Sequence, residues 1–237
     1  MHQEIIDKLN TELENAEPQK ILLSVFQTFN DKVRFASSFG LEDQVITAMI
    51  AEVCPQMPVF TLDTGRLFPE TYDLIEKTNA RYKLQIKVYF PDQIAVESMV
   101  NTLGINLFYD SVENRKHCCG VRKTLPLKRA LSGLSAWVTG LRRSQSVTRT
   151  NLQVVEWDEA NGLIKVNPLI NWSEDEVKNY ISLHKIPYNT LHDKGFPSIG
   201  CQPCTRAIGP GEDIRAGRWW WELPEQKECG LHQTKGN

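Results

Sequence analysis

The sequence predicts an α/β protein with a doubly wound, mainly parallel β-sheet. Through the first half of its 237 residues, short β-rich runs alternate with amphipathic helical stretches. Strands that alternate with helices in this way form βαβ units, in which neighbouring strands run parallel. Serine- and glycine-containing turns follow the first two predicted strands, and folds of this class bind ligands at the carboxyl ends of their strands.

The first thirty residues are expected to form two short helices, the second of which is opened by Pro18. The strand–helix alternation begins after them. Strands are predicted over residues 33–38, 58–63 and 85–89, and each is followed by a predicted helix, over residues 42–53, 69–81 and 93–103.

The second half of the chain is less regular. A helix is predicted over 118–131 despite Pro126, then a strand over 136–140 and a hairpin of 153–157 with 163–167. Ser173 and Glu176 form a capping box that starts another helix, whereas the periodicity is lost from Asn189 onward. We therefore predict N-terminal helices (1–30), a main domain (31–210) and a flexible C-terminal tail (211–237).

Composition narrows the class of function. The net charge is −2, so no strong field attracts nucleic acid or a membrane surface, and no apolar run is long enough for a membrane helix. The N-terminal residues do not resemble a signal peptide, and together with cysteines that are expected to stay reduced this predicts a cytoplasmic protein. Basic residues nevertheless crowd the adjacent cysteines Cys118 and Cys119, and this clustering favours an anionic ligand. These basic residues are Arg115, Lys116, His117, Arg122, Lys123, Lys128 and Arg129.

The cysteines indicate two kinds of site. Four of the six form tight pairs, in the order Cys118, Cys119, Cys201 and Cys204, and Cys229 stands alone near the C-terminus. All-thiolate ligation suits zinc or an iron–sulfur cluster. Adjacent side chains diverge, which a bulky cluster tolerates better than a compact zinc site does. Cys54 is expected to be a buried, inert small side chain.

Two turns on the predicted ligand edge could bind a nucleotide. The turn at 37–43, Ser-Ser-Phe-Gly-Leu-Glu-Asp, joins a strand to a helix, where backbone amides and hydroxyls can cradle an anion. The turn at 62–66, Leu-Asp-Thr-Gly-Arg, ends the second strand. Taken singly, each pattern is equally typical of an ordinary helix cap or turn.

Together these residues resemble a known family, the iron–sulfur type of assimilatory adenylyl-sulfate reductase within the phosphoadenylyl-sulfate reductases. The turn at 37–43 resembles the modified phosphate loop of the adenine-nucleotide α-hydrolase-like fold. The resemblance extends in order over residues 30 to 232 or so and is carried by segments 37–43, 62–66, 118–123, 137–143, 200–206, 211–222 and 228–232.

The resemblance implies reduction of adenosine 5′-phosphosulfate to sulfite and AMP, a step of sulfate assimilation toward cysteine biosynthesis. It assigns a [4Fe–4S] cluster to the two cysteine pairs. It assigns the nucleophile to Cys229, which would carry an S-sulfocysteine intermediate, and the reductant to thioredoxin or a similar dithiol protein. A thiolate is a competent nucleophile toward an electrophilic sulfur.

The resemblance also implies the substrate contacts. The phosphosulfate is expected to meet Lys123, Arg149, Arg215 and Arg218, with His232 beside the nucleophile. The adenosine is expected over Ser37, Ser38, Phe39, Gly40, Leu62 and Gly140. Phe39 stands where ATP pyrophosphatases have a small glycine, and its ring is predicted to leave less room for a pyrophosphate. Of the three adjacent tryptophans, Trp219 to Trp221, at least one is expected to pack inside the protein.

Other functions remain open from sequence alone. The nearest are dual specificity or reduction of the 3′-phosphorylated nucleotide. A different class is a non-enzymatic iron–sulfur or zinc nucleotide sensor, which would not need a tail nucleophile. An ATP-dependent tRNA thiolase lacks support because the chain has no pyrophosphatase loop and no basic face for RNA. We expect neither nucleic acid nor membrane as a partner, and the sequence does not decide whether the chain forms a homo-oligomer.

Overall fold

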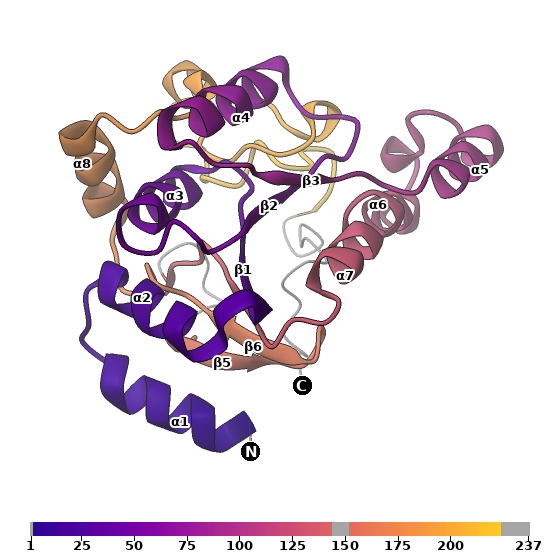
Figure 1. The fold of residues 1–237 in the computed structure, drawn as a ribbon. Coiled ribbons are helices and arrows are strands. Elements are labelled where there is room, and N and C mark those ends of the chain that lie inside the picture. Colours follow the sequence, from indigo (N-terminus) through magenta and orange to yellow (C-terminus); the bar gives the residue numbers. More distant parts are fainter. Residues whose placement is uncertain (1, 144–151, 224–237) are drawn as a thin grey trace. The chain divides into compact units, whose positions relative to one another are not determined.

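The computed structural model describes residues 2–143 and 152–223 (Figure 1). Its sheet has six strands in the order β3-β2-β1-β4-β6-β5. The strands are β1 (Val33–Ala36), β2 (Val59–Leu62), β3 (Lys87–Tyr89), β4 (Ala136–Val138), β5 (Val155–Asp158) and β6 (Leu163–Val166). β1 pairs in parallel with β2 and β4, β4 pairs in parallel with β6, and β5 pairs antiparallel with β6. The predicted α/β class and mainly parallel sheet are therefore confirmed.

The predicted helices of the first half are all present, and the three predicted with bounds match them to within one residue. They are α1 (His2–Leu13), α2 (Pro18–Phe29), α3 (Leu41–Val53), α4 (Pro69–Tyr82) and α5 (Gln93–Leu103). Pro18 stands in the first turn of α2, and the Ser173–Glu176 capping box opens α8 (Glu174–His184), as expected. No helix of the described residues is long and apolar enough to cross a membrane.

The helix predicted over 118–131 needs correction. It starts earlier, as α6 (Val112–Cys119), then widens into a π-helical segment (Gly120–Thr124) before α7 (Leu125–Leu131). Ser111 caps α6 by accepting a hydrogen bond from the Asn114 N–H. The Leu125 N–H bonds to the Gly120 carbonyl, five residues back, just before Pro126, which has no donor. The polar composition of α6 gave no apolar period from which its start could be predicted.

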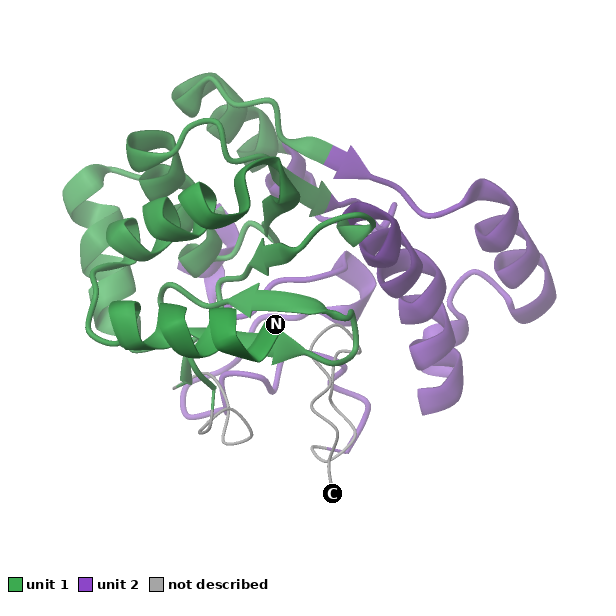
Figure 2. Cartoon of the chain, turned by 60° about the horizontal axis from the view of Figure 1, so that its bottom comes forward, with its two compact units in different colours: residues 1–61, 73–87, 131–189 green, residues 62–72, 88–130, 190–237 purple. Residues whose placement is uncertain are grey.

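The chain divides into two compact units (Figure 2). Unit 1 comprises residues 1–61, 73–87 and 131–189 and has an apolar core that includes Phe35, Ile46 and Val138. Unit 2 comprises residues 62–72, 88–130 and 190–237, and its core includes Phe108, Val121, two cysteines and Trp219. The sequence boundaries at residues 30 and 210 stay a prediction.

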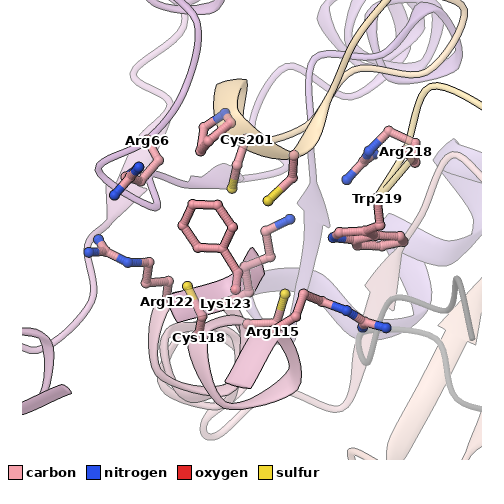
Figure 3. A pocket seen from close by; sticks show the side chains of 12 residues that line it. Arg66, Arg115, Cys118, Arg122, Lys123, Cys201, Arg218 and Trp219 are labelled. Atoms are coloured by element: carbon pink, nitrogen blue, oxygen red, sulfur yellow. The ribbon is translucent and has the colours of Figure 1, made fainter. Parts of the chain in front are cut away.

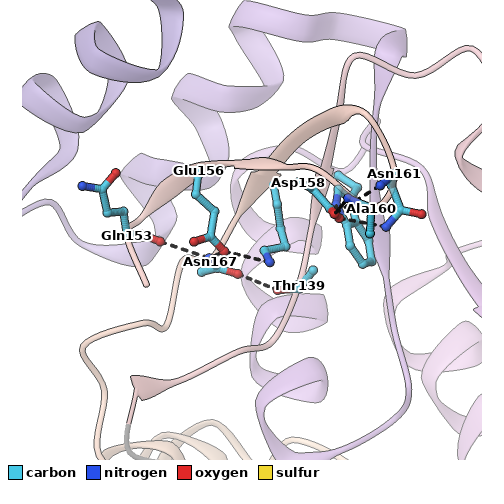
Figure 4. A network of polar contacts seen from close by, with 9 residues as sticks. Thr139, Gln153, Glu156, Asp158, Ala160, Asn161 and Asn167 are labelled. Atoms are coloured by element: carbon cyan, nitrogen blue, oxygen red, sulfur yellow. Dashed lines mark hydrogen bonds and ion pairs between the residues drawn. The ribbon is translucent and has the colours of Figure 1, made fainter. Parts of the chain in front are cut away.

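A buried polar network fixes the edge hairpin of unit 1 to β4 (Figure 4). Asn167 is fully buried, and its side-chain oxygen accepts from the Thr139 hydroxyl at 2.7 Å while its amide nitrogen donates to the Gln153 carbonyl at 3.0 Å. Asp158 accepts from the Trp137 indole N–H at 3.1 Å and from the backbone of the hairpin turn. Because each buried polar group is satisfied, the network holds the end of β4 in one position.

Candidate active site

The four paired cysteines line one pocket, which lies within unit 2. Cys118 and Cys119 occupy the last turn of α6, whereas Cys201 precedes and Cys204 ends a short 3₁₀ turn (Gln202–Cys204). In Figure 3 the sulfurs of Cys118 and Cys201 point toward one another from opposite sides of the pocket. The other lining residues are Arg66, Phe108, Arg115, Arg122, Lys123, Pro203, Arg218 and Trp219. The structure thus brings together two cysteine pairs that are about eighty residues apart in the sequence.

Backbone and side-chain hydrogen bonds hold the second pair in place. The Gln202 N–H donates to the Arg66 carbonyl at 2.8 Å, and the Cys204 N–H donates to the Cys201 carbonyl at 3.0 Å. The Thr64 hydroxyl lies 3.2 Å from the sulfur of Cys201. These contacts fix the Gln202–Cys204 turn against the segment that follows β2, which the sequence had placed on the ligand edge.

The thiols of the pocket differ in acidity. Burial raises the pKa of Cys201, but attraction to Lys123 and the Thr64 hydrogen bond outweigh it, so the net pKa lies below its ordinary value. Burial, together with repulsion from the Cys201 thiolate, raises the pKa of Cys204 to about 12. Burial likewise raises the pKa of Cys118. The pocket on its own therefore favours the thiolate of Cys201, and a bound cation is needed to ionise Cys118 and Cys204.

Unsatisfied donors also face this region. The indole N–H of Trp219 and the Nε–H of Arg218 are buried and have no hydrogen-bond partner among the described residues. Both residues line the cysteine pocket. Buried donors of this kind need an acceptor, and an anionic group in the pocket would provide one. Within residues 2–143 and 152–223, no three His, Cys, Asp or Glu side chains are arranged as a ready site for a metal ion.

A second group of predicted residues meets in unit 1, where the loops after β1 and β4 approach each other. Asp43, in the first turn of α3, accepts hydrogen bonds from the Ser38 N–H at 2.5 Å and the Ser38 hydroxyl at 2.7 Å. A Cβ at Gly140 would lie 2.1 Å from an Asp43 oxygen, so only glycine fits there. Arg142 also binds Glu42 at 2.8 Å. Strand order reverses direction between β1 and β4, which is where such sheets bind ligands.

Phe39 contributes backbone conformation to this loop. Its φ is 63°, in the left-handed region that disfavours bulky residues, and its ring is only 2 % exposed in the core of unit 1. The ring therefore packs inward, and the predicted narrowing of the loop by the ring needs correction. Ser37, Ser38 and Gly40 share the loop, and Leu62 ends the adjacent strand β2.

Asp43 is expected to make stability depend on pH. Burial raises its pKa from 3.8 to about 6. Because the folded chain then binds the proton more tightly than the unfolded chain, this group's contribution falls as the pH rises from about 4 to about 6, by on the order of 3 kcal/mol. In Asp43→Asn this contribution is absent. Urea unfolding across that window should show the stability of the parent falling relative to the variant, and parallel curves would contradict the assignment.

The remaining predicted residues are placed as follows. Lys123 and Arg218 line the cysteine pocket, whereas Arg215 is half-buried in the turn before Arg218 and is not among the lining residues. Arg149, Cys229 and His232 lie outside the described residues. Sequence reasoning did not assign Thr64, which contacts Cys201, to the site. It also did not assign several residues that line the pocket: Arg66, Phe108, Arg115, Arg122 and Pro203.

Several of these residues lie in segments that the sequence had already singled out, namely the Leu62–Arg66 turn and the basic run beside Cys118. The sequence did not indicate which side chains of these segments line the pocket.

Two other predictions are confirmed. Cys54 is 1 % exposed and burial raises its pKa to about 11, as expected of an inert thiol. Trp219 is 1 % exposed, whereas Trp220 is 39 % exposed.

Comparisons with known proteins agree on one family. The family profile of the phosphoadenosine phosphosulfate reductase domain matches residues 32–207. An adenosine 5′-phosphosulfate reductase of Allochromatium vinosum is 57 % identical over 205 residues, which is 86 % of this chain and 80 % of that protein. A protein of the same name from Burkholderia cepacia is 51 % identical, over 90 % of this chain and 85 % of that protein.

Solved structures give the same result. The phosphoadenylyl-sulfate reductase of Candida auris, solved as a phosphate complex, superposes with a TM-score of 0.75 at 34 % identity, covering 88 % of this chain and 98 % of that one. The FMN adenylyltransferase of Candida glabrata shares the fold alone, with a TM-score of 0.53 at 16 % identity, 96 % of this chain and 74 % of that one being covered. On the sequence match, the shared fold and the extent of the alignments, this chain belongs to the phosphoadenosine phosphosulfate reductase domain family.

Proposed function

We propose that this chain reduces adenosine 5′-phosphosulfate to sulfite and AMP in sulfate assimilation. The observation that carries the proposal is the pocket in which two cysteine pairs meet a set of cations, in a chain whose relatives at about half identity are named adenosine 5′-phosphosulfate reductases. The cytoplasm, where thiols stay reduced, is the compartment that we propose for it.

The pocket residues fit a [4Fe–4S] cluster. Cys118, Cys119, Cys201 and Cys204 would hold it, because all four thiols line the same pocket and soft thiolates are the ligands of such clusters. The raised pKa values of Cys118 and Cys204 fit the same view, since a bound cationic centre would ionise them. When bound, the cluster supplies a fixed charge beside Lys123 and does not pass on the two electrons of the reaction.

The cations of the pocket would bind the substrate. Lys123 and Arg218 line the pocket, and Arg218 has a buried Nε–H without a partner among the described residues. Guanidinium groups bind phosphate and sulfate oxygens through two donors, and a lysine acts as a compact charge. Arg215 and Arg149 complete the set that we propose for the phosphosulfate, and the Ser37–Gly40 loop, Leu62 and Gly140 are proposed for the adenosine.

Cys229 carries the proposed covalent step. Its thiolate attacks the sulfur atom of the phosphosulfate, an S–S bond forms, and the bond from that sulfur to the phosphate oxygen breaks. AMP leaves with the electron pair of the broken bond, and the enzyme holds an S-sulfocysteine. His232, three residues from the nucleophile, is proposed to orient the substrate or to favour the thiolate.

A dithiol protein such as thioredoxin completes the cycle. Its thiolate attacks the sulfur of Cys229, and sulfite leaves with the electron pair of the S–S bond. The mixed disulfide is then resolved by the second thiol of the partner. The partner is oxidised to a disulfide and the sulfate sulfur is reduced by two electrons, so the step balances without electrons from a metal centre.

The proposal is tested by a sulfite-release assay with thioredoxin and both nucleotides, adenosine 5′-phosphosulfate and its 3′-phosphorylated form. We expect sulfite from the first substrate at a kcat/KM at least about tenfold higher than from the second. Equal values would establish dual specificity, and a higher value for the 3′-phosphorylated form, after which the matching family is named, would establish a reductase of that nucleotide. Nucleotide binding with no sulfite from either substrate would replace the reductase by a nucleotide sensor.

A further inference from the structure

Arg218 is held in place by side chains from several segments of unit 2, some of them distant from it in the sequence. We propose that Arg115 and Glu222 are positioning residues that hold the guanidinium of Arg218 in its binding orientation, and that they act through the ring of Trp219. The inference rests on the proposed function, in which Arg218 binds the anionic part of the substrate. All four residues belong to unit 2.

The first part of the support is a buried ion pair. The Nε–H of Arg115 donates to one carboxylate oxygen of Glu222 at 2.9 Å, and its Nη2 donates to the other at 2.7 Å. The two side chains are 1 % and 3 % exposed. A two-point contact fixes the plane of the guanidinium as well as its position. The pair joins α6, one turn before Cys118, to the segment that carries Trp219.

The second part is the stack on Trp219. The central carbon of the Arg115 guanidinium lies 4.7 Å from the centre of the indole ring, and that of Arg218 also lies 4.7 Å from it. Trp219 is fully buried and has a φ of 42°, a strained value for a bulky residue that persists only where the surroundings fix it. The Arg115–Glu222 pair provides that restraint.

The third part is the close approach of Arg218 to Gly200. A Cβ at Gly200 would lie 2.4 Å from the Nη2 of Arg218 and 2.7 Å from its central carbon, so the guanidinium is in close contact with bare backbone. The Nη1 of Arg218 reaches the Ser198 hydroxyl at 3.4 Å. The side chain is thus confined by Gly200 and by the Trp219 ring.

Among the described residues, one of the two guanidinium groups that stack on Trp219 is neutralised by a carboxylate and the other is not. Glu222 neutralises Arg115, whereas no carboxylate among the described residues is paired with Arg218. Arg218 lines the cysteine pocket, and its buried Nε–H has no partner in the described part of the chain. The pair therefore fixes Arg218 through packing and leaves its positive charge available for an anion.

The test compares AMP with adenosine as ligands of the cluster-loaded protein, because only AMP carries the anion. For Arg115→Met we expect the affinity for AMP to fall about tenfold to a hundredfold, since a small misplacement of Arg218 weakens its contacts. Affinity for adenosine and iron content per chain should stay at the parent values. Arg115→Lys keeps the charge but not the two-point contact, so it should recover only part of the loss.

Further variants separate positioning from general damage. Arg115→Met/Glu222→Met removes both charges and leaves no buried carboxylate unpaired, so it should be at least as stable as Arg115→Met and should show the same loss for AMP. In an Arg218→Ala background, Arg115→Met should cause little additional loss. The matched control is Arg206→Met, which breaks the exposed ion pair of Arg206 with Glu212 in the same unit and should bind AMP like the parent.

Three results of the binding measurements would overturn the inference. They are parent-like AMP affinity in both the single and the double variant, an equal loss for AMP and adenosine, or a loss that adds fully to that of Arg218→Ala. A fall in iron content parallel to the fall in AMP affinity would also overturn it, because the pair would then support the metal site. Failure of the proposed function is a separate result, seen as absence of sulfite release by the parent protein.

Discussion

Replacing Cys229 with serine is expected to stop sulfite release. A serine hydroxyl is not ionised at neutral pH and is a far weaker nucleophile toward sulfur than a thiolate, so we expect the rate to fall at least about 1,000-fold. AMP formation should fall in parallel, because the leaving group departs only when the S–S bond forms. Iron content and AMP affinity should not change. The measurement is single-turnover formation of AMP and sulfite with the substrate adenosine 5′-phosphosulfate.

Cys54 offers a matched control for this variant. It is also a lone cysteine, but it is buried in the core of unit 1 and burial raises its pKa to about 11. Cys54→Ala should therefore keep the parent rate and lose about 1 kcal/mol of stability, the typical cost of a small cavity. Sulfite release by Cys229→Ser at the rate of Cys54→Ala would exclude Cys229 as the nucleophile.

Replacing Cys201 with serine is expected to have the second largest effect. Cys201 is the thiol whose pKa lies below its ordinary value, and both it and Cys204 belong to the core of unit 2. The parent should contain about four iron and four sulfide per chain, and the variant less than about one of each. Sulfite release should fall at least about 100-fold, since even residues outside the ligand shell contribute tenfold to a hundredfold.

The melting temperature of Cys201→Ser should fall as well, because a metal bound only by the folded chain stabilises it. Iron, sulfide and zinc are measured on the same protein sample as the thermal unfolding curve. Cys54→Ala again removes one thiol and should keep its iron and sulfide. Zinc without sulfide in the parent protein would contradict the cluster assignment and favour a zinc site.

Local patterns predicted most of the fold. The alternation of strands and helices, the hairpin of 153–157 with 163–167 and the capping box at Ser173 each depend on residues close in sequence, and each is confirmed. The start of α6 was missed because its polar residues carry no apolar period. The cysteine pairs indicated a shared site, and they do line one pocket.

Long-range contacts could not be predicted in the same way. Arg115 and Glu222 are 107 residues apart, and neither lies in a pattern that indicates the other. Asp43 approaches Gly140 only because β1 and β4 pair in parallel in one register, which the sequence does not specify. Such contacts arise from topology, so sequence reasoning located the segments of the site without its internal supports.

The central claim is that the thiol of Cys229 takes the sulfo group from the nucleotide before any reductant acts. Peptide mass spectrometry after mixing the parent protein with adenosine 5′-phosphosulfate, with no thiol present, tests it directly. We predict a mass gain of one SO₃ group on the peptide that contains Cys229, with AMP released in equal amount, and loss of that gain when thioredoxin is added. An unmodified Cys229 in protein that turns over once thioredoxin is supplied would contradict the claim.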